Sequence, residues 1–224
     1  MAGRMVKLLR EHGLAFTMFG IFAATLIGLS FVGWDTYNQE QADHGEATVG
    51  FVAYLGTPNF GEAVFENWES EFLQMAAYVV LTIWLVEKGS SESKPPEGDP
   101  ELDADPRSAR RDPNAPGPVR RGGWQLSLYE NSLGIVFAML FLLSIALHAL
   151  GGASEYNANR KAHGERPVSV GTFVTTSTFW FQSFQNWQSE FLAVGSLVTL
   201  SVYLRQRGSP ESKPAAAPHD RTGS

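Results

Sequence analysis

Two nearly identical nine-residue segments carry the residues best suited to chemistry. FENWESEFL spans residues 65–73 and FQNWQSEFL spans residues 184–192, and each places a glutamate, Glu71 or Glu190, at the start of a long apolar run. If each apolar run belongs to a helix that crosses a bilayer, this carboxylate lies several residues below the outer end of the helix. An ionisable side chain at that depth normally faces the bundle interior and marks a site. The two segments therefore predict an intramembrane polar site.

The members of this candidate site are polar residues that both segments keep, together with one histidine at a similar depth. They are Asn67, Ser70, Glu71, Asn186, Ser189, Glu190 and His148. Glu66 and Glu69 of the first segment are glutamines in the second, so hydrogen bonding is kept there and charge is not. His148 is the only histidine within an apolar run, so an ion pair with Glu71 or Glu190 is one interpretation.

Anchoring at the membrane surface is the other interpretation of the same segments, and it is the favoured one. Trp68 and Trp187 are suited to the headgroup level of a bilayer, where tryptophan is enriched. Asn, Ser and Glu are also favoured near a helix start. His148 is in that case a hydrogen-bonded packing residue. A bis-histidine haem site is not expected, because no second histidine lies in an apolar run.

The loops that follow the first and third apolar runs also repeat a pattern, Tyr-Asn and then His-Gly-Glu. Two histidines and two glutamates form a ligand set that suits zinc, and these weak metal candidates are His44, Glu46, His163 and Glu165. Their spacing matches no established metal-binding pattern, and an exposed polar turn is the favoured interpretation. We therefore assign no metal and no cofactor.

Four apolar runs must position these residues. Residues 14–34, 72–86 and 191–204 contain no charged residue, and residues 126–152 contain only Glu130. A helix crosses a bilayer with about 20 mainly apolar residues, which the runs at 72–86 and 191–204 reach only if they begin inside the nine-residue segments. Four buried helices of a soluble protein are the alternative, but such helices alternate polar and apolar faces. The first run is also longer than the apolar core of a signal peptide.

The chain is internally duplicated. Residues 9–95 align with residues 128–214 without a gap, and roughly a third of the aligned residues are identical. Because each unit crosses the membrane twice, both copies share one orientation, which makes a parallel repeat. The predicted fold class is therefore an all-α membrane protein with four transmembrane helices from a tandem two-helix unit. The expected segments are a first unit (1–88), a disordered linker (89–123), a second unit (124–207) and a disordered tail (208–224).

Charge predicts the orientation. Lysines and arginines gather in the N-terminal segment, the linker and the C-terminal tail, whereas the first loop, residues 35–63, contains none. Positive residues are enriched on the cytoplasmic side of membrane proteins. We expect a multi-pass protein of the cytoplasmic membrane with both termini in the cytoplasm.

The run FENWESEFLQMAAYVVLTIWL, then GSSESKP, then the same layout in the second half, resembles a family of uncharacterised bacterial, notably actinobacterial, integral membrane proteins. The resemblance implies a bacterial membrane protein, and it supplies no activity and no catalytic residue. The second copy departs from the pattern at Gln185 and Gln188. Why both halves keep ESKP is not explained by the sequence.

The sequence excludes more functions than it supports. The absence of cysteine excludes disulfides, thiolate metal sites and cysteine nucleophiles, and no phosphate-binding, metalloprotease or hydrolase motif is present. The first interpretation is a non-enzymatic structural or accessory subunit of a membrane assembly. A small transporter or ion pathway using Glu71 and Glu190 is the alternative, and an outer-face metal sensor or enzyme is a distant third. Expected partners are the lipid bilayer and a larger complex or homo-oligomer, with no nucleic acid.

Overall fold

The computed structural model describes residues 2–223, and every regular element in that range is helical. The four long helices are α1 (Ala2–Asp43), α3 (Pro58–Leu81), α6 (Ser132–Ala162) and α8 (Ser177–Tyr203). The short elements are α2 (Phe51–Tyr54), η1 (Pro106–Ala109), α4 (Gly117–Arg121), α5 (Gly123–Glu130) and α7 (Val170–Phe173). The prediction of an all-α chain is confirmed for the described residues.

Two helices are long and apolar enough to cross a membrane, at Lys7–Asp43 and Ser132–Ala162. They contain the first and third of the apolar runs. The other two long helices, α3 and α8, contain the polar nine-residue segments (residues 65–73 and 184–192), which lower their hydropathy. By length and composition, α1 and α6 are therefore the candidate membrane-spanning helices among the described residues.

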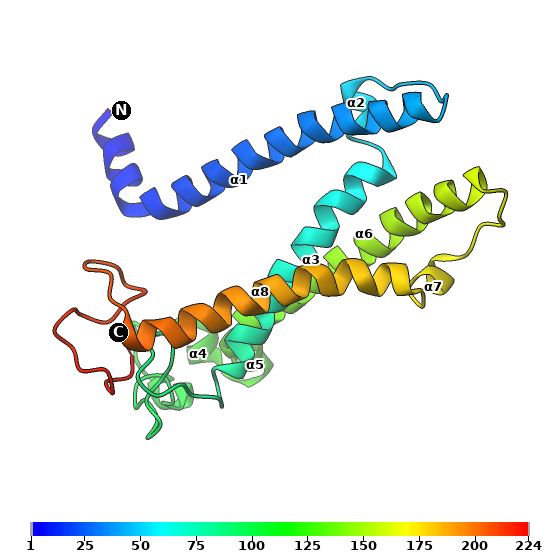
Figure 1. The fold of residues 1–224 in the computed structure, drawn as a ribbon. Coiled ribbons are helices and arrows are strands. Elements are labelled where there is room, and N and C mark those ends of the chain that lie inside the picture. Colours follow the sequence, from blue (N-terminus) through cyan, green and yellow to red (C-terminus); the bar gives the residue numbers. More distant parts are fainter. Residues whose placement is uncertain (1, 224) are drawn as a thin grey trace.

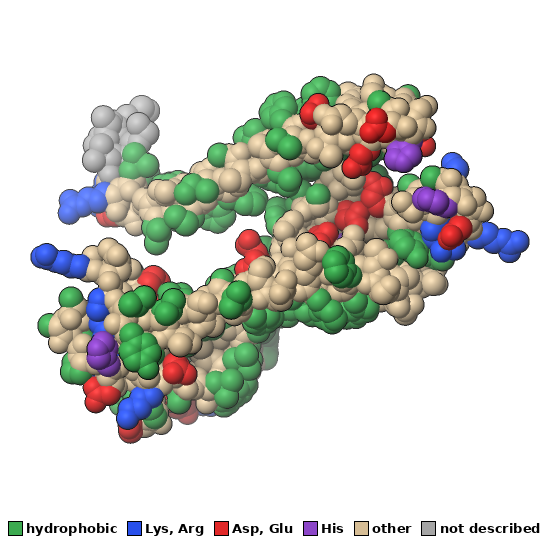
Figure 2. Space-filling view, viewed as in Figure 1, with side chains coloured by type: hydrophobic (Ala, Val, Ile, Leu, Met, Phe, Trp, Pro, Cys, Tyr) green, Lys and Arg blue, Asp and Glu red, His purple; other side chains and the backbone are tan. Residues whose placement is uncertain are grey.

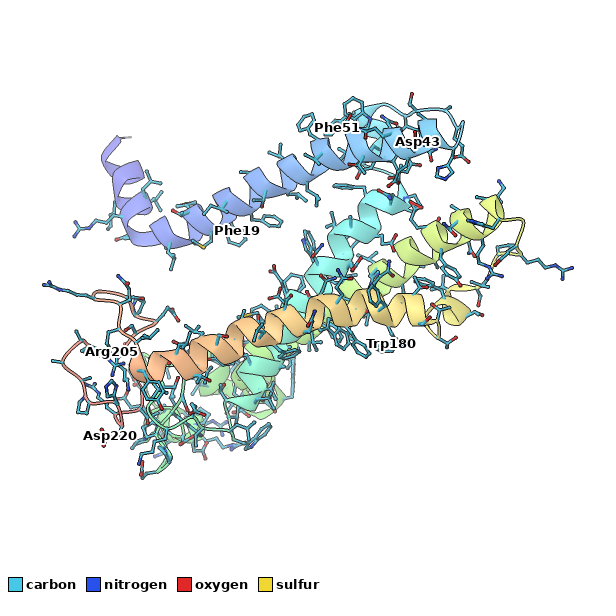
Figure 3. All side chains as sticks on the ribbon, viewed as in Figure 1. Phe19, Asp43, Phe51, Trp180, Arg205 and Asp220 are labelled. Atoms are coloured by element: carbon cyan, nitrogen blue, oxygen red, sulfur yellow. The ribbon has the colours of Figure 1, made fainter. Side chains whose placement is uncertain are left out.

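The helices α3, α6 and α8 pack together, and α1 lies apart from them over most of its length (Figure 1). The longest contact is between α3 and α6, and α8 packs on α3. Helix α1 bends at His12, whose backbone is not helical (φ −126°, ψ 18°), and it contacts α2 and α3. Phe51 of α2 stacks on Phe31 of α1 with ring centroids 4.5 Å apart (Figure 3).

Threonine caps start both α3 and α8. The hydroxyl of Thr57 accepts a hydrogen bond from the backbone N–H of Phe60 at 3.3 Å, and Thr176 accepts the equivalent bond from Phe179 at 3.3 Å. A threonine at this position satisfies one of the N–H groups that a helix start leaves free. Thr57 and Thr176, which correspond in the alignment of the two units, thus cap their helices in the same way.

The loops after α1 and α6 are also closed in the same way. The side chain of Asn38 bonds both backbone groups of Val49, at 2.8 and 3.0 Å. Asn157 does the same to Val168, at 2.8 and 2.9 Å. Each asparagine therefore ties the end of its long helix to the segment that leads into the next one.

A glycine lets α6 approach α3 closely. A Cβ atom at Gly151 would lie 3.0 Å from the backbone nitrogen of Glu62 and 3.2 Å from the carbonyl oxygen of Pro58. Contacts that short are tighter than ordinary van der Waals contact, so a larger residue would push the helices apart. This approach brings the first turns of α3 against the middle of α6.

The N-terminus, the C-terminus and the linker lie at one end of the molecule, and α2 and α7 lie at the other (Figure 1). The linker and the tail contact each other at their end. Gly89 donates its N–H to the hydroxyl of Thr222 at 2.9 Å, and Gly223 donates to the carbonyl of Ser90 at 2.9 Å. The buried hydroxyls of Ser90 and Ser201 are hydrogen-bonded at 2.8 Å. The sequence predicts that the linker and the tail are disordered. That stays a prediction, and disorder would break these hydrogen bonds.

The repeated ESKP now has a structural explanation. Its serine, Ser93 or Ser212, accepts a backbone N–H from six residues earlier, Glu87 or Gln206, at 2.9 Å in both copies. The same hydroxyl donates to the carbonyl of the following lysine at 3.1 Å. The serine therefore closes the turn that follows each second helix of a unit.

The exterior of the long helices differs from that of a water-soluble bundle. Large apolar side chains lie on the outside of the long helices, where Leu14 is 74% exposed and Phe181 is 70% exposed (Figure 2). The buried set includes polar residues on three of these helices: Glu69, Ser70, Gln74, Ser144, His148, Ser183 and Ser201. A soluble monomer rarely exposes apolar patches of this extent, so the outer surface needs a cover.

Candidate functional site

A buried hydrogen bond between a histidine and a glutamate lies where α3 and α6 cross. The Nδ1 atom of His148 lies 2.9 Å from Oε2 of Glu69, and both side chains are fully buried. The indole Nε1–H of Trp187 on α8 donates to the other carboxylate oxygen of Glu69 at 3.1 Å. One carboxylate thus connects all three packed helices.

Two more carboxylates of α3 extend this site along the helix. The side-chain amide of Gln182 donates to Oε1 of Glu62 at 2.6 Å, and that of Asn186 donates to Oε1 of Glu66 at 2.7 Å. The amide oxygen of Gln182 lies 3.4 Å from Nε2 of His148. We call these seven residues the polar cluster: Glu62, Glu66, Glu69, His148, Gln182, Asn186 and Trp187.

Helical spacing explains how the cluster is assembled. Glu62, Glu66 and Glu69 follow one another at i, i+4 and i+7, which places them on one face of α3. Gln182 and Asn186 stand four residues apart and share a face of α8. The ring of Phe179 covers the imidazole of His148, with centroids 5.0 Å apart and planes 23° apart.

The cluster carries more negative than positive charge. Its donors to the carboxylates are two amides, an indole and one imidazole. In the described part of the chain, the lysines and arginines that form ion pairs are Lys7, Lys94, Arg107 and Arg160, and each pairs with an acid outside the cluster. Buried charge that is not compensated is costly. Protons or a bound cation would neutralise the carboxylates of the cluster. Figure 2 displays acidic side chains gathered along α3 beside α6.

The structure brings some of the predicted site residues together and separates others. His148 and Asn186 belong to the polar cluster, but their partners are Glu69 and Glu66, not Glu71 and Glu190. Trp187, predicted to be a surface anchor, donates into the same cluster.

The remaining members of the predicted site bond to their own helices or face outwards. The amide of Asn67 donates to Ala63 at 2.8 Å. Ser70 and Ser189 donate to backbone carbonyls three residues earlier, at 2.7 and 2.8 Å. Ser70 is buried, Glu190 is half-buried and Glu71 is exposed. A role for the two glutamates as an ion site stays a prediction.

Glu71 lies at a groove between α1 and α3. The groove has a volume of about 300 Å³ and is lined by Met18, Phe19, Phe22, Trp68, Glu71 and Phe72. Trp68, the other predicted anchor, meets Phe22 of α1 with ring centroids 5.9 Å apart. Figure 3 places Phe19 midway along α1. The surroundings of Glu71 are therefore mainly apolar.

The loop residues predicted as weak metal ligands are exposed and stand in two separate turns. The imidazoles of His44 and His163 bond the carbonyls of Glu40 and Asn159, at 2.7 and 2.9 Å. Glu165 pairs with Arg160 at 2.8 Å. Among the described residues, the group of His, Asp and Glu side chains close enough to share a metal ion is a different one, Glu62, Glu66 and His148.

Sequence reasoning missed four members of the polar cluster: Glu62, Glu66, Glu69 and Gln182. A signal was present, because three glutamates at i, i+4 and i+7 mark one face of a helix. The repeat does not preserve this signal, because the second copy has glutamine at the positions of Glu66 and Glu69.

A family model described as "Domain of unknown function (DUF6766)" matches residues 5–224. The chain belongs to this family. No curated protein and no solved structure matches the chain. The polar cluster of this DUF6766 protein therefore has to be interpreted from its own geometry.

Proposed function

We propose that this protein is a multi-pass integral membrane protein that acts as a non-enzymatic structural or accessory subunit of a membrane assembly. The observation that carries the proposal is the apolar exterior of the long helices together with their polar cluster. Apolar side chains cover the outside of the long helices, and a hydrogen-bonded polar cluster lies inside. Lipid or the apolar surface of another membrane protein can cover such an exterior.

Four membrane crossings from a tandem two-helix unit are the architecture that we propose. Helices α1 and α6 are long and apolar enough to span, and α3 and α8 return the chain to the side on which each unit began. The paired caps at Thr57 and Thr176, and the paired loop bonds of Asn38 and Asn157, support the duplication. The charge of the two sides supports cytoplasmic termini in a bacterial plasma membrane.

Within this architecture the polar cluster holds the two units together. Glu62, Glu66 and Glu69 come from the first unit, and all of their partners come from the second. Hydrogen bonds between helices supply the association that the hydrophobic effect does not supply inside a bilayer. The site is accordingly a structural joint.

A transporter that uses Glu71 and Glu190 is less well supported. The groove that reaches Glu71 is lined mainly by apolar side chains and does not include Glu190. An ion pathway needs polar groups along its length. We therefore keep the subunit as the proposed function.

Native mass spectrometry of the protein, extracted from its own membrane in mild detergent, tests this proposal. We expect a defined assembly of several chains, whose mass exceeds the 24.6 kDa of one chain. Purified protein in lipid vesicles should carry no proton or cation flux above that of empty vesicles. A single chain that supports flux, with the flux abolished by Glu71→Gln, would contradict the proposal and favour the transporter.

A further inference from the structure

Three side chains of the polar cluster present metal ligands to a common point. One carboxylate oxygen from Glu62, one from Glu66 and one ring nitrogen of His148 all lie within 4.8 Å of one another. Ligand atoms around a tetrahedral zinc ion are about 3.4 Å apart, since each lies about 2.1 Å from the metal. Small rotations of the two flexible glutamates close that difference.

The second nitrogen of His148 is already oriented as in a metal site. Its Nδ1 atom lies 2.9 Å from the carboxylate of Glu69, and a carboxylate acceptor there places the proton on Nδ1 and leaves a lone pair on Nε2. Metal-binding histidines are usually held in this way by a carboxylate, which fixes the ring and raises its basicity.

In this tautomer, the lone pair on Nε2 accepts no hydrogen bond. The amide oxygen of Gln182 lies 3.4 Å from Nε2, and it is itself an acceptor, because the nitrogen of that amide donates to Glu62. His148 is fully buried, so bulk solvent does not reach this nitrogen. A metal ion bound to Nε2 and to the amide oxygen would satisfy both acceptors, and their separation already equals the edge of the tetrahedron.

Charge points to the same occupant. Glu62 and Glu66 receive one amide hydrogen bond each, and no lysine or arginine in the described chain pairs with them. A divalent cation neutralises two carboxylates in the bundle interior, where an uncompensated charge is expensive.

We propose that Glu62, Glu66 and His148, with the amide oxygen of Gln182, bind one divalent transition-metal ion, and that Glu69 positions the histidine. One imidazole nitrogen and three oxygens favour Zn²⁺ or a similar first-row ion over Ca²⁺ and Mg²⁺, which take oxygen ligands. The ion would join α3, α6 and α8 at one point. This inference goes beyond the proposed function and does not depend on which proteins surround the chain.

Metal titration of the detergent-purified, chelator-treated protein tests the site, with Zn²⁺ and Co²⁺ as the probes. Wild type should bind one ion per chain, and bound Co²⁺ should display the visible absorption of a tetrahedral site. Glu69→Gln should weaken binding roughly 10–100-fold, as loss of an orienting carboxylate does. Glu62→Gln and Glu66→Gln keep the shape of the side chain and should weaken binding further.

Two control variants separate this site from its rivals. Glu71→Gln removes a carboxylate from the same helix but outside the cluster, and it should bind as wild type does. The double variant His44→Ala, His163→Ala removes the loop histidines and should also bind normally. Stoichiometric metal binding that survives in both Glu62→Gln and Glu66→Gln would overturn the proposal. So would a wild type that binds no metal.

X-ray absorption of Zn²⁺ bound to wild type gives a result that does not depend on variants folding. The proposed site predicts the scattering of one imidazole among oxygen ligands. The scattering of two imidazoles would assign the ion to the loop histidines and would overturn the site at His148.

Discussion

Glu69 and Glu71 stand two positions apart on α3 and have opposite surroundings. Successive residues of a helix are rotated by about 100°, so two positions place side chains on nearly opposite faces. Glu69 is fully buried between His148 and Trp187, whereas Glu71 is exposed beside the apolar groove along α1. The same side chain is thus a joint between helices at one position and a surface group at the other.

Replacement of Glu69 tests its role in the joint. Glu69→Leu leaves the imidazole of His148 and the indole of Trp187 without their acceptor. Removal of one partner from a buried pair costs about 3–5 kcal/mol, so we expect a lower free energy of unfolding and a lower melting temperature in detergent by circular dichroism. Glu69→Gln keeps one acceptor oxygen and should lose about 1–3 kcal/mol.

Glu71→Leu is the matched control for that series. Because the Glu71 side chain is exposed, the change should shift the free energy of unfolding by about 0.5 kcal/mol or less. If Glu71→Leu destabilises the protein as much as Glu69→Leu does, the assignment of the joint to Glu69 is wrong.

At this scale the sequence predicted some of the site and not the rest. His148 was identifiable because a histidine in an apolar run is rarely there by chance, and Asn186 was identifiable because both repeats keep it. The partner of His148 was not identifiable. The sequence does not say how α6 is rotated about its axis, and that rotation decides whether the imidazole meets Glu69 or Glu71.

Among the elements, α3 and α6 make the most extensive contact, and their backbones approach closely at one point. Gly151 sets it, because a Cβ atom there would lie 3.0 Å from the backbone of Glu62. Backbone atoms of a helix cannot move aside as a flexible side chain can. The first turns of α3, which carry the glutamates of the cluster, therefore keep their distance from α6 through this glycine.

We expect Gly151→Ala to destabilise the bundle although alanine favours helices. Overpacking of a close contact costs about 1–3 kcal/mol, and separation of α3 from α6 lengthens the bond between Glu69 and His148. Gly195→Ala on α8 is the control, because a Cβ atom there meets nothing within 4 Å, and it should stabilise by a few tenths to about 1 kcal/mol. Thermal unfolding in detergent distinguishes the two, and equal effects would contradict the close packing.

The junction of linker and tail makes a prediction about pH. Burial raises the pKa of the Glu92 carboxyl, and the neighbouring Glu211 carboxylate raises it further. A carboxyl whose pKa is higher in the folded state favours its neutral form there. Its contribution to stability therefore falls as pH rises from the pKa of the unfolded chain to that of the folded one.

Glu92→Gln removes this penalty at neutral pH. Amides of the junction, such as those of Gly89 and Gly223, should exchange hydrogen a few-fold more slowly in the variant at pH 7 and equally fast in both proteins near pH 4. Glu101→Gln, an exposed linker position, is the control and should match wild type. Unprotected exchange in all three proteins would mean that the linker and tail are disordered, as their composition predicts.

The long helices were predictable because apolar runs mark them. Their ends were less so, since α1 continues to Asp43 through a polar stretch and α3 begins at Pro58, upstream of the apolar run. The four-residue helices α2 and α7 have too few residues for a periodic signal.

For the whole molecule, the apolar exterior of the long helices is the feature on which the proposed function depends. Helix α1 packs little against the others, and its candidate span is 6% buried. An apolar surface of that extent typically marks a site of contact with lipid or with another protein. The concentration of lysine and arginine in the termini and the linker could be read from the sequence. The position of α1 beside the bundle could not, because no pattern along the chain specifies the partner of α1.

Cysteine labelling tests the membrane-spanning account most directly, since the natural chain has no cysteine. Asp43→Cys lies at the end of α1, and Ser108→Cys lies in the linker; both positions are exposed. In intact bacterial cells an impermeant maleimide should label Asp43→Cys and should label Ser108→Cys only after lysis. The reverse pattern, or equal labelling of both in intact cells, would contradict a protein that crosses the membrane with its termini in the cytoplasm.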